Sequence, residues 1–199
     1  RSSDLPINGI DSILLPTNVK SATANIIAIC ATSYAVAALD INGNVTAWGG
    51  SIYGGDPSNN FYTTKPFTVN LANITRIYSN DYGFLAIDTD GYLYGWGGGT
   101  NGNVNYGVNL PNMVPSGTLF NDVYSTSEDF LAISSNNTAY ILGNNITILQ
   151  TVTNVVKVVS NDGGFAMIDT SGNGNIYGYD YTLADKPTLT NIVKIISNK

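Results

Sequence analysis

Three aspartates share one local pattern and are the first candidates for chemistry. Asp40, Asp88 and Asp169 are each followed three residues later by a glycine, and the stretch Asp88-Thr89-Asp90-Gly91 is similar to the start of a calcium-binding loop. However, no third carboxylate follows at loop spacing, and no glutamate closes any copy. Asp side chains in such places often accept hydrogen bonds from nearby backbone amides. The sequence therefore favours aspartates that stabilise turns, and we expect no metal site.

Histidine is absent from the 199 residues, and Cys30 is the only cysteine. These counts exclude a Ser-His-Asp or Cys-His catalytic pair, a His-ligated zinc or haem, an internal disulfide and a CxxC motif. We expect Cys30 to pack as a small hydrophobic side chain in a strand. The sequence offers no catalytic residues and no cofactor site, so we expect a protein that is not an enzyme.

The chain also carries unusually little charge. Charged residues make up 11% of it, against about 25% in ordinary globular domains. A net charge of −6 with 8 Lys and Arg argues against binding to nucleic acid, which needs a basic face. The apolar runs are shorter than the roughly 18 residues that a membrane span needs, so no membrane insertion is expected. The surface must then consist largely of Asn, Ser, Thr, Gly and Tyr.

Two variable segments, residues 52–64 and 100–112, are the candidate binding surface. Loops on a rigid scaffold commonly carry binding, and Tyr gives rigid contact area while Asn gives adaptable hydrogen bonds. The candidate binding residues are Tyr53, Asp56, Phe61, Tyr62, Asn101, Asn103, Asn105 and Tyr106. The alternative is that both segments are solvated loops with no partner.

The elements that must position these residues form a repeat. Residues 73–81 match residues 154–162 almost one for one, residues 191–198 start the same unit again, and residues 25–30 and 120–125 are looser copies. A following segment, residues 83–96, aligns with residues 35–48, more weakly with 130–142, and with 165–179 if Asn173 and Gly174 are an insertion. Unit starts roughly 34–48 residues apart are typical of propellers and solenoids.

Each unit is predicted to be a set of strands. Residues 74–79 alternate apolar and polar side chains, residues 83–88 form a more buried strand, and residues 92–96 form a third. Asn42-Gly43 and Asp90-Gly91 are expected to be two-residue hairpin turns. Almost no helix is expected. Antiparallel hairpins repeated radially describe an all-β, propeller-like array.

One aromatic position recurs in this scheme. Trp48, Trp96 and Tyr179 are placed as equivalents, with Leu142 in the remaining unit. Aromatic residues that recur once per blade usually pack inside or between blades, and carbohydrate stacking is the alternative.

The order of these features resembles the repeats of the regulator of chromosome condensation family. In that family a strand beginning V-x-x-I leads to A-L-x-x-D-G and then to V-Y-x-W-G. The corresponding pieces here are residues 74–77, 86–91 and 93–97, and the resemblance covers roughly residues 18–199. It implies a β-propeller fold, whereas the nucleotide exchange promoted by the founding member of the family does not carry over, because function resides in sites rather than in folds. Where that family has a glycine at the end of the first strand, this chain has Thr32, Asn80 or Asn161.

The predicted organisation is four blades and part of a fifth. Residues 1–24 are an N-terminal segment, in which residues 7–16 are a candidate outer strand of the closing blade. The repeats follow as residues 25–72, 73–119, 120–153, 154–190 and a partial unit, 191–199. We expect the array to be incomplete, or to be completed by another segment of chain, and an exposed strand edge would favour self-assembly.

The function that fits best is a non-catalytic binding or structural module. It would engage a protein or glycan partner through blade loops or strand edges. The low charge and the Asn-, Tyr- and Thr-rich composition favour an extracellular, cell-surface or virion setting, including adhesion. A carbohydrate-binding, lectin-like propeller and a regulator that contacts a small GTPase are the alternatives.

Overall fold

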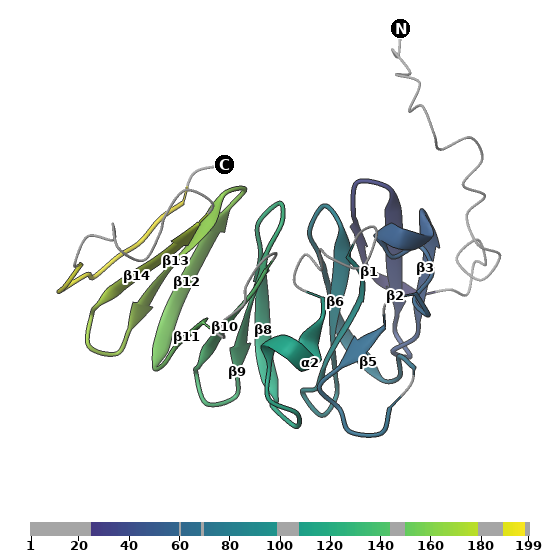
Figure 1. Ribbon diagram of the computed structural model, residues 1–199, viewed down its shortest axis with the longest axis horizontal. Coiled ribbons are helices and arrows are strands. Elements are labelled where there is room, and N and C mark those ends of the chain that lie inside the picture. The colour runs from purple at the N-terminus through teal and green to yellow at the C-terminus, as the bar shows by residue number, and fades with distance from the viewer. Residues whose placement is uncertain are drawn as a thin grey trace, which may run out of the picture.

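In the computed structural model the chain forms four antiparallel sheets that lie side by side in chain order (Figure 1). The structure describes residues 25–59, 61–68, 70–98, 108–143, 150–178 and 189–197. Two short helical segments, η1 (Ser51–Tyr53) and α2 (Leu110–Met113), accompany the sheets within these ranges. The prediction of an all-β, blade-like array with almost no helix is therefore confirmed for the described residues.

Each sheet is one blade, built on three strands that are consecutive in sequence. The first blade is β1 (Ile26–Ala31), β2 (Ala35–Asp40) and β3 (Val45–Gly49). The second is β5 (Ile74–Ser79), β6 (Gly83–Asp88) and β7 (Leu93–Gly97), with β4 (Tyr62–Thr63) at its edge. The third is β8 (Phe120–Ser125), β9 (Phe130–Ser134), β10 (Ala139–Leu142) and β11 (Gln150–Val152). The fourth is β12 (Val155–Asn161), β13 (Gly164–Asp169) and β14 (Gly174–Gly178).

The short strand β4 belongs to one repeat in sequence and to the next blade in space. It follows β3 in the chain, but Tyr62 pairs with Gly95 and Thr63 with Tyr94, so it extends the second blade. Thr64 continues this attachment, since its N–H donates to the C=O of Leu93 at 2.9 Å and its hydroxyl accepts the N–H of Leu93 at 3.0 Å. The segment after β3 thus links the first two blades physically.

The strand pairs repeat with the same irregularity in every blade. The register of the first strand shifts just after its first residue, between Ile26 and Ala28 in the first blade and at the matching place in the others. The bulged residue of each blade is exposed: Ile27, Thr75, Asn121 and Val156. The bulge reorients the strand, so that its first and fourth residues, such as Ile74 and Ile77, face the preceding blade.

The hairpin between the second and third strands is one residue longer than predicted. In the second blade the N–H of Gly91 donates to the C=O of Asp88, and the pair of Asp88 and Tyr92 closes the loop. Gly91 has a φ of +92°, whereas Asp90 is not among the residues with positive φ. The expectation that Asp90-Gly91 forms a two-residue turn was therefore wrong. The loop is a three-residue connection that ends in a left-handed glycine, because the Asp88 carboxylate stabilises the preceding turn.

The same register corrects the alignment of the fourth unit. Gly172 occupies the place of Gly91, and Phe165 pairs with Tyr177 as Phe84 pairs with Trp96. No insertion at Asn173 and Gly174 is needed, and the predicted equivalence of Tyr179 was wrong. Tyr177 takes that position, and Tyr179 itself lies outside the described residues.

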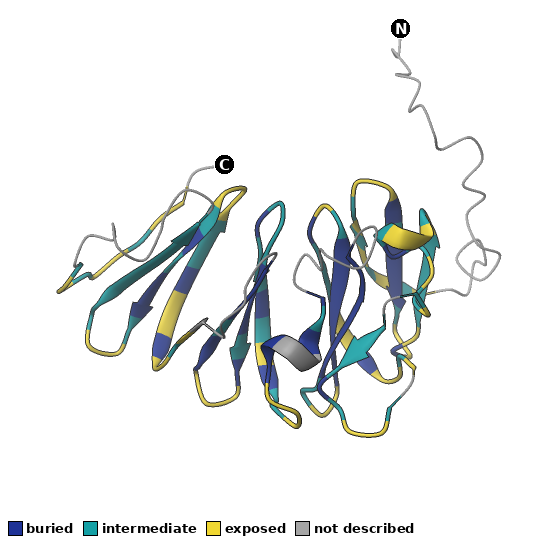
Figure 2. Ribbon diagram, in the orientation of Figure 1, coloured by how far each residue is buried: buried dark blue, intermediate teal, exposed yellow. Residues whose placement is uncertain are grey.

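The core lies between the blades. Three clusters of buried apolar side chains alternate with the four sheets, and Figure 2 shows the buried colour concentrated in the strands while the turns are exposed. In each cluster the earlier blade contributes residues such as Ala37 and Leu39, and the later blade contributes an aromatic side chain such as Phe84. The third and fourth blades repeat this with Phe130 and Phe165. Burial of this apolar area between sheets is the main stabilising contribution.

Two series of backbone hydrogen bonds fix the blades relative to one another. At one end the N–H of a loop residue donates to the C=O of its equivalent in the next blade: Ser33 to Asp81, Asp81 to Ser127, and Ser127 to Asp162. At the other end the first residue of each blade donates back to the turn of the preceding blade: Ile74 to Gly43, Phe120 to Gly91, Val155 to Asn137, and Ile192 to Gly172. Ile192 thus bonds to the fourth blade in the same way as the first residues of the later blades bond to the blade before them. Residues 1–24, with the candidate outer strand at 7–16, lie outside the described residues.

The asparagine that opens most units has a conformational role. Asn25, Asn73, Asn154 and Asn191 all have φ between 43° and 58°. Asn tolerates this left-handed region better than other residues that carry a Cβ. The conformation lets the C=O of Asn73 accept the N–H of Thr89 while Ile74 donates to the first blade. The recurrent Asn is therefore a backbone requirement of the repeat.

We expect Asn73→Val to lower the free energy of unfolding by roughly 1–2 kcal/mol, because a β-branched residue is strained at positive φ. Asn73→Gly serves as the control and should leave stability nearly unchanged, since glycine adopts this conformation freely. Urea unfolding followed by circular dichroism measures both. Equal losses for the two variants would show that the Asn73 side chain, and not the backbone conformation, is what matters.

Candidate functional site

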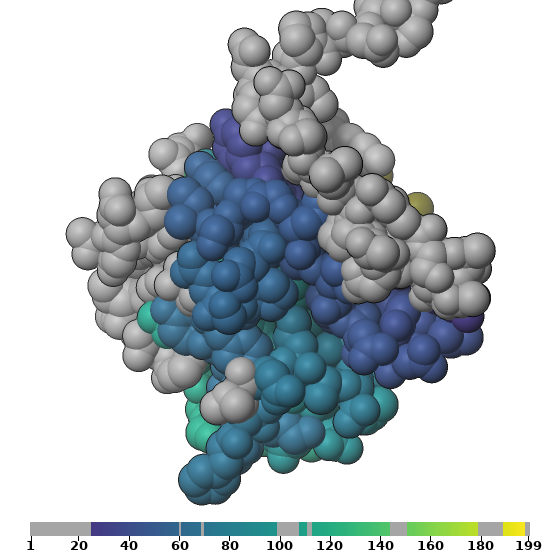
Figure 3. Space-filling model, turned by 90° about the vertical axis from the view of Figure 1, so that its right-hand side faces the viewer, coloured from purple at the N-terminus to yellow at the C-terminus, as the bar shows by residue number. Residues whose placement is uncertain are grey.

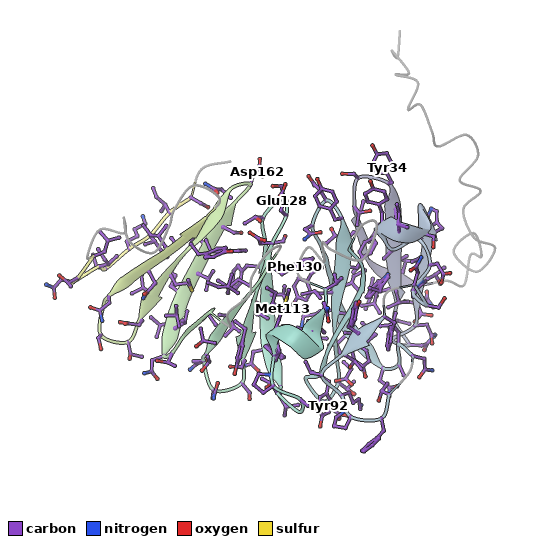
Figure 4. All side chains as sticks on the ribbon, in the orientation of Figure 1. Tyr34, Tyr92, Met113, Glu128, Phe130 and Asp162 are labelled. Carbon is purple, nitrogen blue, oxygen red and sulfur yellow. The ribbon has the colours of Figure 1, made fainter. Side chains whose placement is uncertain are left out.

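The links between the first and second strands of all four blades gather at one end of the molecule. These links are residues 32–34, 80–82, 126–129 and 162–163, and together with Asn161 at the end of β12 and residues 50–59, which follow β3, we call them the loop face. Figure 4 shows Tyr34, Glu128 and Asp162 at this end and Tyr92 at the opposite end. The hydrogen bonds from Ser33 through Asp81 and Ser127 to Asp162 hold the loops in a row. The loop face is therefore one continuous surface on a rigid scaffold.

Three tyrosines cluster on the loop face across the first two blades. The Tyr53 ring centroid lies 4.6 Å from that of Tyr34 and 6.2 Å from that of Tyr82. The Tyr34 side chain remains 51% exposed, while Tyr53 and Tyr82 are half-buried. The Thr32 hydroxyl donates to the C=O of Tyr53 at 3.1 Å and ties the segment carrying Tyr53 to the first loop. This tyrosine cluster offers a preorganised aromatic surface.

A polar side chain closes each of the four loops from within. The Thr32 hydroxyl accepts the N–H of Ala35, and the Asn80 Oδ1 accepts the N–H groups of Tyr82 and Gly83 at 2.9 and 2.8 Å. Thr126 and Asn161 do the same in the third and fourth blades. In the family that these repeats resemble, glycine stands at these positions. The departures from the family pattern are therefore Asx and Thr turns that order the loops.

The loop face has an uneven charge. It carries five acidic residues, which are Asp56, Asp81, Glu128, Asp129 and Asp162. None of the 8 Lys and Arg of the chain falls in its segments. Asp81 and Asp162 are exposed, and hydrogen bonds from Ser58 hold the pKa of Asp56 below its usual value. The surface is therefore both acidic and aromatic.

The structure separates the residues that the sequence grouped as a binding surface. Tyr53 lies in the tyrosine cluster, and Asp56 is exposed near it in sequence. The ring centroid of Phe61 lies 6.1 Å from that of Tyr94, in the cluster between the first two blades. Tyr62 lies on β4 and packs against the cluster between the second and third blades. The other four, Asn101, Asn103, Asn105 and Tyr106, lie outside the described residues.

Sequence reasoning missed Tyr34 and Tyr82. Both residues stand directly before the second strand, at the same position of the first and second units. The recurrence of Tyr at this position in two aligned units was a signal that the sequence contained. However, only the inter-blade geometry shows that Tyr53, which comes from a different part of the repeat, fits between them.

The aspartate pattern is turn chemistry. The Oδ1 atom of Asp40, Asp88 and Asp169 accepts two backbone N–H groups each, from the second and fourth residues that follow. Hydrogen bonding to the charged form lowers the pKa of Asp40 and of Asp169. Ser134 accepts the N–H of Thr138 in the third blade. Across the described ranges, no group of three or more His, Cys, Asp and Glu side chains is placed to hold a metal ion.

In the second blade, Asp88 has different side-chain partners from those of Asp40 and Asp169. The second carboxylate oxygen of Asp40 and of Asp169 accepts an amide of Asn44 or Asn173, but Tyr92 stands at that position in the second blade. There the Oδ2 atom of Asp88 accepts the Lys65 ammonium at 2.9 Å and the Tyr94 hydroxyl at 3.0 Å. Lys65 also contacts Asp90 at 3.0 Å and lies 5.1 Å from the Tyr92 ring centroid.

This Lys65–Asp88–Tyr94 network fixes the segment after β4 to the second blade. The Asp88 side chain is fully removed from solvent, and its burial raises its pKa, but hydrogen bonds from Lys65, Tyr92 and Tyr94 outweigh this and lower it. The bonds to Asp88 and Asp90 raise the pKa of Lys65. The network lies near Tyr92, at the end opposite to the loop face (Figure 4). We therefore assign it a structural role.

Trp96 and Cys30 both pack between blades. Trp96 is fully buried, its ring centroid lies 5.2 Å from that of Phe84, and its indole N–H donates to the C=O of Gly54 at 3.0 Å. The packing interpretation of the recurrent aromatic is confirmed there. Cys30 packs against the same cluster, and burial raises its pKa to about 12 despite a hydrogen bond with Ser79. A thiol with that pKa is a poor nucleophile at neutral pH.

Blades of antiparallel hairpins stacked face to face define the class: the described residues form part of a β-propeller. Among solved structures, the fold is that of the RCC1-like β-propellers. The chain is similar to Prp20p from Saccharomyces cerevisiae, with 15% identity and a TM-score of 0.53 over 84% of this chain and 49% of that one. It is also similar to human WBSCR16, with 14% identity and a TM-score of 0.51 over 77% and 47% of the two chains.

A third similar structure is the ectodomain of the receptor kinase CR4 from Physcomitrella patens. Its identity is 18% and its TM-score 0.51, over 79% of this chain and 40% of that one. The chain thus spans about half the length of the propellers it matches or less. No family model matches the sequence, and no curated protein matches it. Identities this low establish the fold alone, and they agree with the predicted resemblance.

Proposed function

We propose that this protein is a non-catalytic binding module and that its loop face recognises a basic segment of a protein partner. The observation that carries the proposal is the tyrosine cluster, which presents a half-exposed Tyr34 among loop segments that, as described, contain no Lys or Arg. Tyrosine gives large contact area at little conformational cost. Tyr rings also attract Arg and Lys side chains, and acidic neighbours such as Asp81 add electrostatic complementarity.

Related folds support a protein partner. Prp20p has been studied for its binding to Gsp1p and histones, and Kap60 has been crystallised bound to yeast RCC1 (Prp20). An extracellular, cell-surface or virion setting is part of the proposal. It is supported by the low content of charged residues and by the similar fold of the CR4 ectodomain. Surface labelling of the tagged protein in its native setting would test the location.

The test uses an arginine-rich peptide as a probe and compares two aromatic variants. We expect Tyr34→Ala to weaken binding of an oligo-arginine peptide about tenfold, which corresponds to the loss of one good cation–π contact. Phe67→Ala is the matched control, because Phe67 is fully exposed but lies between Lys65 and β5, away from the loop face. Fluorescence anisotropy at physiological salt measures both, and neither variant changes the net charge.

Two results would contradict the proposal. If Tyr34→Ala and the wild type bind the peptide equally, the attraction is only that of an acidic protein for a cation. The second result has three parts: the wild type binds a sugar on a glycan array, Tyr34→Ala abolishes that binding, and the arginine-rich peptide does not bind. In that case the lectin-like alternative replaces the proposed basic partner. That alternative is favoured by one observation, the exposure of Tyr34 beside the ring of Tyr53.

A further inference from the structure

The outer face of the first blade has the composition of a buried interface. It is formed by Ile29, Val36 and Trp48, which we call the start face. Figure 3 views the molecule from this end, with the first blade toward the viewer. Ile29 is 64% exposed, and Val36 and Trp48 are only half-buried. Isolated exposed apolar side chains are common, but these three belong to a set that the other blades bury.

The repeat shows what normally covers these positions. Their equivalents face the preceding blade and pack into the inter-blade clusters in every later blade. In the second blade they are Ile77, Phe84 and Trp96; in the third, Val123, Phe130 and Leu142; in the fourth, Val158, Phe165 and Tyr177. Of these nine side chains, Phe84, Trp96, Phe130 and Leu142 are completely buried. The occupant that fits the start face is therefore another blade of this type.

The chain carries the complementary surface at its other end. Leu189 pairs with Gly174 at the edge of the fourth blade, as Val152 pairs with Ala139 in the third. The fifth blade begins after it, because the N–H of Ile192 donates to the C=O of Gly172 as the first residue of each later blade does to the preceding turn. We call residues 189–197 the tail segment. Within this tail segment, Ile196 is 79% exposed. Its equivalents Cys30, Tyr78 and Tyr124 face the following blade and pack against it. Ile196 thus occupies the position that a further start face would cover.

We infer that a second copy of this chain docks its start face against the tail segment of the first, head to tail. The contact continues an interface that the chain already makes three times, and both halves are present in one molecule. The docking uses sheet faces, in addition to the strand edges considered from the sequence, and does not rest on the proposed loop-face function.

The backbone supports the same direction of assembly. Each later blade makes two hydrogen bonds to the blade before it. The N–H of its first residue donates to the preceding blade, and the C=O of its loop residue accepts an N–H from that same blade. In the first blade these groups are the N–H of Ile26 and the C=O of Ser33. A docked copy would extend both series of hydrogen bonds by one step.

The test compares two isoleucines on one strand. Sedimentation velocity of the full chain should show the mass rising with concentration from 21.1 kDa to two or more copies. Ile29→Asp should raise the concentration of half-association at least tenfold, because a carboxylate would be buried without a partner. Ile27→Asp is the matched control, since the bulge position is exposed in every blade. It should leave association unchanged.

A second measurement follows the fluorescence emission of Trp48. Association should shift its emission to shorter wavelength, whereas Trp96 is already buried and should not respond. A chain that stays monomeric up to hundreds of micromolar would overturn the inference, and so would equal effects of Ile27→Asp and Ile29→Asp. Tyr34→Ala should leave association intact, which separates this result from failure of the loop-face proposal.

Discussion

Replacing Asp88 by alanine is expected to lower the free energy of unfolding by about 3 kcal/mol, because a buried carboxylate that accepts several hydrogen bonds is lost and the buried Tyr94 hydroxyl is left without its acceptor. The carboxylate is completely removed from solvent and accepts four hydrogen bonds, from the N–H groups of Asp90 and Tyr92, the Tyr94 hydroxyl and the Lys65 ammonium. Alanine would leave the buried Tyr94 hydroxyl and the Lys65 ammonium without this acceptor. Urea unfolding followed by far-UV circular dichroism measures the loss.

Asp40→Ala is the matched control. Asp40 occupies the same turn position and accepts the same two backbone N–H groups, but its remaining partner is the amide of Asn44 at the surface. Asp40→Ala should therefore lower the free energy of unfolding by clearly less than Asp88→Ala. If the two variants were equally destabilised, the turn alone would matter, and the structural role assigned to the Lys65–Asp88–Tyr94 network would be wrong.

The same network predicts how stability depends on pH. The pKa of Asp88 in the folded protein lies below 3.8, the value expected for an unperturbed Asp. Its contribution is therefore present above that pH and is lost as the pH falls through the lower, folded value. Because the chain has no His, we expect stability to be nearly constant from about pH 5 to pH 8 and then to fall below about pH 4. Asp88→Ala should show a flatter acid limb than the wild type.

The second large effect is expected for Trp96→Ala, at about 3–5 kcal/mol. The side chain is fully buried between the first two blades, stacks on Phe84 and donates to the C=O of Gly54. Its removal leaves a cavity in the inter-blade core and a C=O without its donor. Far-UV circular dichroism in urea is the appropriate measurement, because one of the two tryptophan signals is lost with the mutation.

The other tryptophan is a control provided by the repeat itself. Trp48 pairs with Val36 as Trp96 pairs with Phe84, but it lies on the start face and is only half-buried. In dilute protein, where copies are separate, Trp48→Ala should cost clearly less than Trp96→Ala. Equal costs would mean that the preceding blade adds nothing to the burial at this position, contrary to the packing of the three clusters.

Much of the fold could be predicted because the repeat records it several times. The Asn-initiated first strand, the buried second strand and the Asp-x-x-Gly turn recur in the sequence, and each copy supports the others. The turn length and the position of Tyr177 were mispredicted for a common reason. Both depend on which backbone atoms pair across the hairpin, and the side-chain pattern of a single strand does not specify that pairing.

The candidate site was predictable only in part. Tyr53 was identified from its loop, but its partners Tyr34 and Tyr82 come from two other loops, and Phe61 and Tyr62 turn inward to pack. Composition indicates that a loop is rich in Tyr, but it does not distinguish a ring that faces solvent from one that fills a gap between blades. Lys65 was missed for the same reason, since its partner Asp88 lies in a different unit of the repeat.

The sequence by itself determined the strand order, the four repeated units and the exclusion of chemistry that depends on histidine, because these follow from residue types and from local periodicity. Only the tertiary structure decided that β4 crosses to the second blade, that three tyrosines meet on the loop face, and that Ile29 and Trp48 stand where another blade would pack. These features arise from contacts between sheets. Such contacts are set by the stacking of whole blades, which join residues far apart in the chain.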